Sequence, residues 1–286
     1  MSGTTVGLAA RAFDSGRVRS AVDERLAAFL DAKARLAVAQ GFPTEVTDVL
    51  RDLVLGGGKR IRPVLCVAGW CAAGRDGDAD GVLQVAASLE MFHAFTLVHD
   101  DVMDRSATRR GRPSADLEAA LRIARFKSAK YTVERPLQLG AVLAGADGGV
   151  WAALSAFGLP LGEAFQLRDD LLGAFGDSPE TRKPEAEDLR EGKHTALLAL
   201  ALRRATGADR DLLTGLWQEM RLGPGQVARI RAVLEGTGAR SGVEELIEER
   251  RCQALQALQA LEDPGLPPAA GAVLRSVVSS LIGPAR

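Results

Sequence analysis

The chain has 286 residues, of which 47% are hydrophobic and 26% charged, and its net charge is -1 at pH 7. These values are typical of an ordinary globular protein and argue against nucleic acid or an anionic membrane as the main partner. An odd number of cysteines without a CxxC pair argues against a disulfide framework or a structural zinc site. We expect Cys66, Cys71 and Cys252 to lie in or near the core. We also expect a cytoplasmic location, since the N-terminus lacks a basic leader followed by an apolar segment.

Strand signals are scarce, and apolar residues recur at intervals of three and four, which predicts an all-α chain. The first helices are expected at 20–39, 44–55, 62–73 and 82–103. The later elements are a polar helix at 115–132, two small-residue helices within 137–161, a helix at 162–175, a charged loop at 176–192 and a run of helices over 195–280. No internal repeat or low-complexity linker interrupts the chain, so we expect one domain over residues 1–286.

The stretch 137–161 is the most membrane-like segment of the sequence. It contains Gln138 and Asp147, a glycine pair and Pro160. Two buried helices joined by a turn explain this composition better than a membrane span does.

Two carboxylate doublets are the most informative feature. The first group is Asp100, Asp101 and Asp104, and the second is Asp169 and Asp170. Asp100 and Asp104 are four residues apart and share a helix face, where like charges need a strong counter-charge. Mg2+ prefers carboxylate oxygens and often bridges them to phosphate oxygens. Solvated surface aspartates are the alternative, but both groups interrupt apolar runs and basic residues follow the first. The pattern therefore predicts a metal site that grips a diphosphate.

A glycine-rich turn, Gly56-Gly57-Gly58-Lys59-Arg60-Ile61-Arg62-Pro63, offers further phosphate-binding groups. It is not a Walker A motif, because the required earlier glycine and the Ser or Thr after the lysine are missing. It can deliver Lys59 and Arg62 near a helix start, where anions are favoured; the alternative is an exposed basic turn. His93 lies seven residues before Asp100, on roughly the same helix face, although a lone histidine on an apolar helix is usually a core residue.

Together these motifs resemble the trans-isoprenyl diphosphate synthases, the polyprenyl synthetase family. The matching segments are Gly-Gly-Lys-Arg-Ile-Arg-Pro, His-Asp-Asp-x-x-Asp, Arg-Arg-Gly-Arg-Pro and Gln-x-x-Asp-Asp, in that order, between about Val46 and Leu200. The similarity is greatest to geranylgeranyl and farnesyl diphosphate synthase-like members. It implies an all-α helical bundle around a central cavity, the isoprenoid synthase fold, with two Asp-rich motifs facing each other.

The resemblance also implies a role for each matching residue. The residues implied to bind the diphosphate of isopentenyl diphosphate are Lys59, Arg62, His93 and Arg110. The residues implied to act on the allylic diphosphate are Arg109, Lys127, Gln166, Lys183 and Lys193. The implied Mg2+ ligands are Asp100, Asp104 and Asp169, supported by Asp101 and Asp170. The implied reaction is a Mg2+-dependent condensation of isopentenyl diphosphate with an allylic diphosphate through an allylic carbocation, without a side-chain nucleophile.

Phe95 is the residue expected to influence product length. It lies five residues before Asp100, about a turn and a half away along the helix. By analogy with the family, one aromatic residue here implies a short product, C15 or C20, with geranylgeranyl diphosphate favoured.

The sequence departs from the family pattern in two places. Gly173 stands where many members have a third aspartate. Only 68 positions separate Asp101 from Asp169, whereas the family pattern implies about two more helices between Pro113 and the helix that holds Lys127. A natural deletion and a segment absent from the sequence as written are the two explanations. Those helices usually line the cavity and the dimer interface, and a homodimer is implied only where they are present.

Two alternatives to the prenyl-transferring enzyme remain open. One is a non-catalytic or truncated subunit of a heteromeric synthase. The other is a class I terpene cyclase, against which the group of Lys59, Arg62 and His93 argues.

Overall fold

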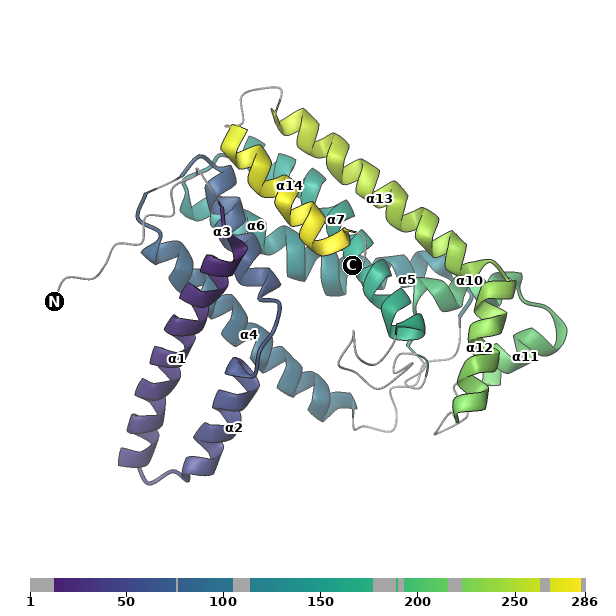
Figure 1. Ribbon diagram of the computed structural model, residues 1–286, viewed down its shortest axis with the longest axis horizontal. Helices are drawn as coiled ribbons and strands as arrows, with labels where there is room; N and C mark the ends of the chain where they lie inside the picture. The colour runs from purple at the N-terminus through teal and green to yellow at the C-terminus, as the bar shows by residue number, and fades with distance from the viewer. Residues whose placement is uncertain are drawn as a thin grey trace. The chain divides into compact units, whose positions relative to one another are not determined.

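The computed structural model describes residues 13–75, 77–104, 114–176, 189, 193–215, 223–262 and 268–283; of these, the side chains of 99–104, 224, 268 and 269 are not described. Every regular element within these ranges is a helix (Figure 1), which confirms the all-α prediction. The chain divides into two compact units. Unit 1 comprises Met1–Ser106, Thr132–Ala156 and Ala257–Ser279, and unit 2 comprises Ala107–Tyr131, Phe157–Gln256 and Ser280–Arg286.

Unit 1 is built around α3 (Ile61–Ala72), which is buried along almost its whole length. It packs against α4 (Asp80–Asp104) and α6 (Arg135–Leu143). The backbones of α3 and α6 pack very closely, because each helix has a glycine at the contact. A β-carbon on Gly140 would lie 1.8 Å from the carbonyl oxygen of Cys66, and one on Gly69 would lie 2.0 Å from that of Leu137.

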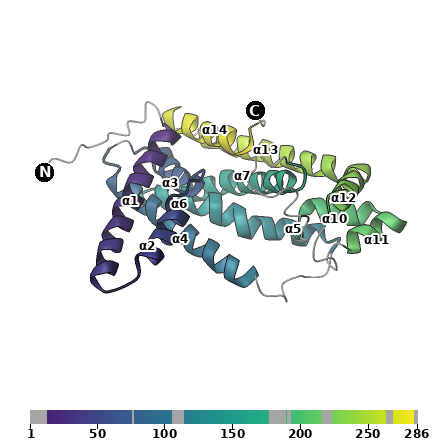
Figure 2. The same ribbon diagram turned by 60° about the horizontal axis from the view of Figure 1, so that its bottom comes forward.

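The helices α1 (Ser15–Ala39) and α2 (Thr44–Leu55) form an antiparallel hairpin in unit 1 (Figures 1 and 2). The bounds of α2 are those predicted. Helix α1 begins five residues earlier than predicted, because the Asp14 carboxylate caps it by accepting hydrogen bonds from the backbone N–H of Gly16 and Arg17.

The segment predicted as one polar α-helix at 115–132 changes helix type. Helix α5 (Leu117–Ala124) gives way to a π-helix, η1 (Arg125–Glu134), which continues into α6. An amphipathic pattern read at the α-helical period does not distinguish these two forms.

Helix α7 (Gly148–Phe175) runs through Pro160. The predicted helix break between residues 161 and 162 is therefore wrong. Proline removes one backbone donor and usually breaks a helix. Here Leu154, Phe157 and Leu161, on both sides of it, are fully buried. Their packing is the physical reason that the helix continues.

Unit 2 has its core around α10 (Ala196–Arg204), a helix with seven consecutive buried residues from Ala196 to Leu202. It packs against α5, α11 (Gly207–Gly215) and α12 (Pro224–Gly236). The remaining helices, α13 (Ala239–Glu262) and α14 (Pro268–Ile282), each have residues in both units. The glycine turn predicted at 236–242 is shorter than expected, because α13 already begins at Ala239 and includes Gly242.

Two further expectations concern the burial of the cysteines and the position of the most membrane-like segment. Cys66 and Cys71 are buried, and burial raises the pKa of the Cys66 thiol to about 12. Cys252 is exposed on α13, so the expectation of a core position is wrong for it. Among the described residues, the one stretch that is long and apolar enough to cross a membrane is Asp80–Val98 of α4. The segment 137–161 does not meet this criterion. A single stretch of this kind is weak evidence for a membrane span.

Candidate substrate-binding site

A pocket of about 180 Å³ lies in unit 1, where the end of α2 and the glycine-rich turn meet the start of α3 and the middle of α4. Its lining residues are Leu53, Val54, Gly57, Gly58, Lys59, Arg60, Ile61, Arg62, Glu90, His93, Ala94 and Leu97. The pocket therefore brings together three residues that the sequence analysis singled out for one diphosphate: Lys59, Arg62 and His93. Cationic side chains at a helix start form a typical anion-binding environment.

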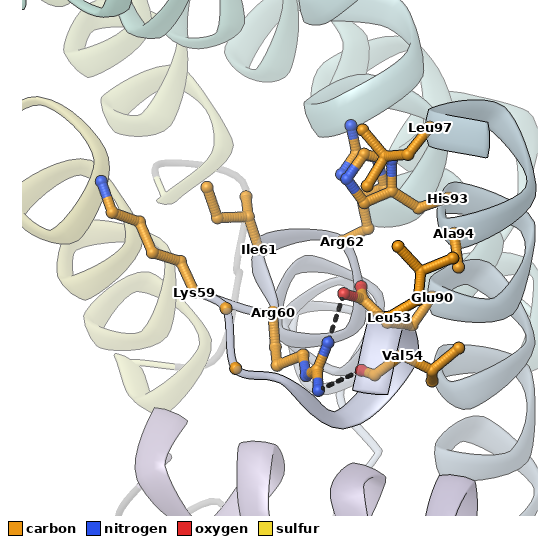
Figure 3. Close-up of a pocket in the computed structure, with 12 residues that line it drawn as sticks. Leu53, Val54, Lys59, Arg60, Ile61, Arg62, Glu90, His93, Ala94 and Leu97 are labelled. Carbon is orange, nitrogen blue, oxygen red and sulfur yellow. Dashed lines mark hydrogen bonds and ion pairs between the residues drawn. The ribbon is translucent and has the colours of Figure 1, made fainter. Parts of the chain in front are cut away.

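The predicted cations lie differently in the pocket. The Arg62 guanidinium donates from Nη2 to Thr132 Oγ1 over 2.8 Å, and Thr132 lies near the end of η1. His93 is half-buried on α4, and its Nδ1 lies 3.4 Å from Thr96 Oγ1. Figure 3 shows Arg62 and His93 on one side of the view and the exposed Lys59 side chain extending to the other. Lys59 therefore has to reorient to join Arg62 and His93 on one ligand.

Arg60 is a buried arginine beneath this turn, only 5% exposed. It donates from Nη1 to Glu90 Oε1 over 2.8 Å and from Nη2 to the Val54 carbonyl oxygen over 2.8 Å (Figure 3). Its Nε donates to Asp23 Oδ1 over 2.8 Å. Burial alone lowers the pKa of Arg60, but the hydrogen bonds and charges of Glu90 and Asp23 outweigh it and raise the pKa overall. Arg60 thus stays charged, with its charge directed at carboxylates rather than at the pocket.

The second carboxylate doublet lies on α7 in unit 2. Gln166 Nε2 donates to Asp170 Oδ1 over 2.7 Å, and the Ser128 hydroxyl donates to Gln166 Oε1. This chain of hydrogen bonds fixes Asp170. Asp169 beside it is exposed and makes no hydrogen bond or ion pair to the described residues. The arrangement leaves the Asp169 carboxylate accessible to a cation.

Other predicted residues are exposed or fall outside the described part of the chain. Lys127 on η1 and Lys193 before α10 are exposed. Phe95 is 63% exposed on α4. The predicted residues that lie outside the described residues, or whose side chains do, are Asp100, Asp101, Asp104, Arg109, Arg110 and Lys183. Among the side chains that the structure describes, no group of three metal-ligating residues occurs.

Three residues at or beside the site escaped the sequence analysis. In the sequence, Arg60 stands out only as a mismatch to a phosphate-loop motif, and Glu90 belongs to none of the motifs. A glutamate one helical turn before His93, on an apolar helix, is a signal that could have identified Glu90. The third is Phe92, whose ring stacks on Phe95 with centroids 6.3 Å apart.

Comparison with known proteins places this all-α chain among the prenyltransferases. The family model described as Polyprenyl synthetase matches residues 43–120 and 114–234, and the chain belongs to this family. A crystal structure of geranylgeranyl pyrophosphate synthase from Corynebacterium glutamicum, complexed with isoprenyl diphosphate and magnesium, is similar with a TM-score of 0.81. It is 32% identical, over 94% of this chain and 99% of that one. The geranylgeranyl diphosphate synthase of Mycobacterium tuberculosis is 30% identical, over 73% of this chain and 77% of that protein.

The alignments indicate that at least one relative has residues without an equivalent in this chain. The two stretches matched by the family model meet at residues 114–120, shortly after Pro113. The short chain isoprenyl diphosphate synthase of Methanothermobacter thermautotrophicus is 26% identical over 299 positions, covering 82% of this chain and 90% of that protein. That alignment is longer than the 286-residue chain itself. The relative therefore contains residues that this chain lacks.

Proposed function

We propose that this chain condenses isopentenyl diphosphate with an allylic diphosphate, in a Mg2+-dependent reaction that yields a C15–C20 product, with geranylgeranyl diphosphate favoured. The observation that carries the proposal is the unit 1 pocket lined by Lys59, Arg62 and His93. Family membership supports prenyl transfer. The names of the Mycobacterium and Methanothermobacter relatives support a short product.

In this proposal the pocket binds the diphosphate of isopentenyl diphosphate. Arg62 offers a bidentate fork to phosphate oxygens, and its hydrogen bond to Thr132 holds the guanidinium in place. His93 and Lys59 add donors, with Arg110 completing the set. Arg109, Lys127, Lys183 and Lys193 are proposed to contact the allylic diphosphate, with Gln166 on the same side. The double bond of isopentenyl diphosphate then attacks the allylic carbon as the carbon–oxygen bond to diphosphate breaks. The resulting cation loses a proton to the departed diphosphate, which leaves a new double bond in the product.

The donor chemistry fits Mg2+. Asp169 presents an exposed carboxylate without a hydrogen bond to the described residues, while Gln166 holds the neighbouring Asp170. Hard oxygen ligands of this kind suit Mg2+. We propose Asp100, Asp104 and Asp169 as ligands, supported by Asp101 and Asp170. When bound, Mg2+ supplies positive charge that stabilises the departing diphosphate.

Isopentenyl diphosphate binding without metal separates condensation from terpene cyclisation. We expect this ligand to raise the thermal midpoint of the protein in the presence of a chelator, because Lys59, Arg62 and His93 bind it directly. Differential scanning fluorimetry measures the shift, which Arg62→Met should abolish. A cyclase has no need of this pocket, so absence of a shift in the wild-type protein contradicts the condensation reaction proposed here.

Phe95→Ala is expected to lengthen the product. Phe95 and Phe92 form a stacked, exposed aromatic pair on α4, before the first aspartate group. Truncation of Phe95 removes the bulk proposed to stop elongation. Chromatography of radiolabelled products, after removal of the diphosphate, reports the chain length. Phe29→Ala removes an exposed ring from α1 and serves as the control, with no expected change. The same product from Phe95→Ala and the wild type would refute this role.

The proposed setting is the cytoplasm, with the two diphosphate substrates as partners. Neither nucleic acid nor a membrane span is required. A homodimer is proposed only for a form that contains the helices missing after Pro113.

A further inference from the structure

Arg60 has an unusual backbone conformation at the start of α3. Its φ of 47° and ψ of 41° place it in the left-handed region. Within the described residues it is the one non-glycine residue with a positive φ. Non-glycine residues adopt this conformation at a cost, and they keep it where the surrounding structure over-determines it. Gly57, three residues earlier, also has a positive φ, 104°, which its missing side chain allows.

The Arg60 side chain connects the turn to three helices at once. Its three hydrogen bonds reach Asp23 of α1, the Val54 carbonyl of α2 and Glu90 of α4. Each of the three nitrogens has a different acceptor, which a planar guanidinium can satisfy and a single ammonium group cannot. Since the pairs with Glu90 and Val54 are buried, Arg60 can hold the turn at a fixed distance from α2 and α4.

The residues that Arg60 holds adjoin the three cations of the pocket. Lys59 precedes Arg60, Arg62 follows two positions later, and His93 lies one helical turn after Glu90. The left-handed residue sets the direction in which the chain leaves the turn and enters α3, and therefore where Arg62 points. Glu90 fixes α4 to the same turn. A buried carboxylate in a diphosphate pocket would repel its ligand, and the ion pair with Arg60 offsets that charge.

We propose that Arg60 is a positioning residue of the isopentenyl diphosphate pocket, which holds the turn at Lys59 and the start of α3 at Arg62 against His93 on α4. This inference rests on the proposed function. Arg60 acts through its neighbours and does not itself touch the substrate, because its guanidinium is buried and all three of its nitrogens donate to protein acceptors.

Arg60→Lys tests the proposal, since it keeps the charge and the unbranched side chain but loses the three-way hydrogen bonding. We expect the KM for isopentenyl diphosphate to rise about tenfold, as the pocket cations lose their geometry. The KM for the allylic primer and kcat should change by less than about threefold. The variant weakens the binding of isopentenyl diphosphate equally in the ground state and the transition state, and such a loss raises the KM of that substrate alone. Calorimetric titration with isopentenyl diphosphate alone should show the same loss of affinity.

Arg25→Lys is the matched control. Arg25 on α1 pairs with Asp80 on α4, so it joins two of the helices that Arg60 joins, but neither residue lines the pocket. We expect an unchanged KM for isopentenyl diphosphate in this variant. An equal rise in both variants, or no rise in Arg60→Lys, would overturn the positioning role. Should Arg60→Lys fail to fold, Glu90→Asp is titrated in its place, because it keeps the negative charge and withdraws the carboxylate from Arg60. Weaker binding is expected, and unchanged binding would overturn the proposal.

The titration also separates this inference from the proposed function. A wild-type chain that binds isopentenyl diphosphate but forms no product refutes the condensation activity, while the comparison of Arg60→Lys with Arg25→Lys still decides the role of Arg60. A wild-type chain that does not bind isopentenyl diphosphate overturns the inference as well.

Discussion

Asp100→Ala is expected to reduce the rate of prenyl transfer by about 10³-fold. Removal of one group that stabilises charge in the transition state typically has an effect of this size. Asp100 lies on α4, with Asp104 one turn further along the same face. Its proposed role is to hold Mg2+ against the leaving diphosphate, whose negative charge develops as the carbon–oxygen bond breaks. The loss should appear in kcat, because the interaction strengthens as the reaction proceeds.

Initial rates with labelled isopentenyl diphosphate over a series of Mg2+ concentrations check this expectation. Asp211→Ala is the control, because it removes an exposed carboxylate on α11 that is not proposed to bind metal. We expect wild-type rates from the control and an unchanged thermal midpoint for both variants. Wild-type activity in Asp100→Ala would contradict the assigned metal ligand.

Gly140→Ala is expected to destabilise the fold by about 3 kcal/mol, the upper part of the range for overpacking a close contact. The added β-carbon would lie 1.8 Å from the Cys66 carbonyl oxygen and 2.7 Å from the Trp70 backbone nitrogen. Both are main-chain atoms of the buried helix α3, so neither can move aside as a flexible side chain could. The helices α3 and α6 would have to separate, and α3 carries Arg62 in its first turn, directly after Lys59 and Arg60.

Thermal unfolding followed by circular dichroism checks this, with an expected fall in midpoint of about 5–10 °C for a chain of this size. Gly81→Ala is the matched control, because a β-carbon at this position in the first turn of α4 would meet no atom within 4 Å. Replacing this helical glycine with alanine should raise the free energy of unfolding by about 0.5–1 kcal/mol. Equal midpoints for the two variants would show that the α3–α6 contact is looser than described.

Local signals in the sequence predict some helices closely and others not at all. The bounds of α2 follow from Pro43 before it and Gly56 after it, which are strong local signals. The π-helix η1 has no comparable signal, because apolar spacing near four residues suits both helix types. Helix α7 passes through Pro160 because of burial on both sides, which depends on tertiary packing rather than on local preference.

The candidate site divides in the same way. Lys59, Arg62 and His93 could be identified from motif and spacing, and they line one pocket. The left-handed conformation of Arg60 could not be predicted, because Asp23, Val54 and Glu90 are distant in sequence from each other and together determine it. The stacking of Phe92 on Phe95 is a tertiary detail that a search for a single aromatic residue does not reveal.

A condensation assay on the 286-residue chain tests the central claim most directly. Labelled isopentenyl diphosphate is incubated with dimethylallyl, geranyl or farnesyl diphosphate, with Mg2+ or with a chelator. Our account predicts a C15 or C20 product that requires Mg2+. A folded chain that binds isopentenyl diphosphate but forms no product with any primer would contradict it, and would favour a non-catalytic subunit instead.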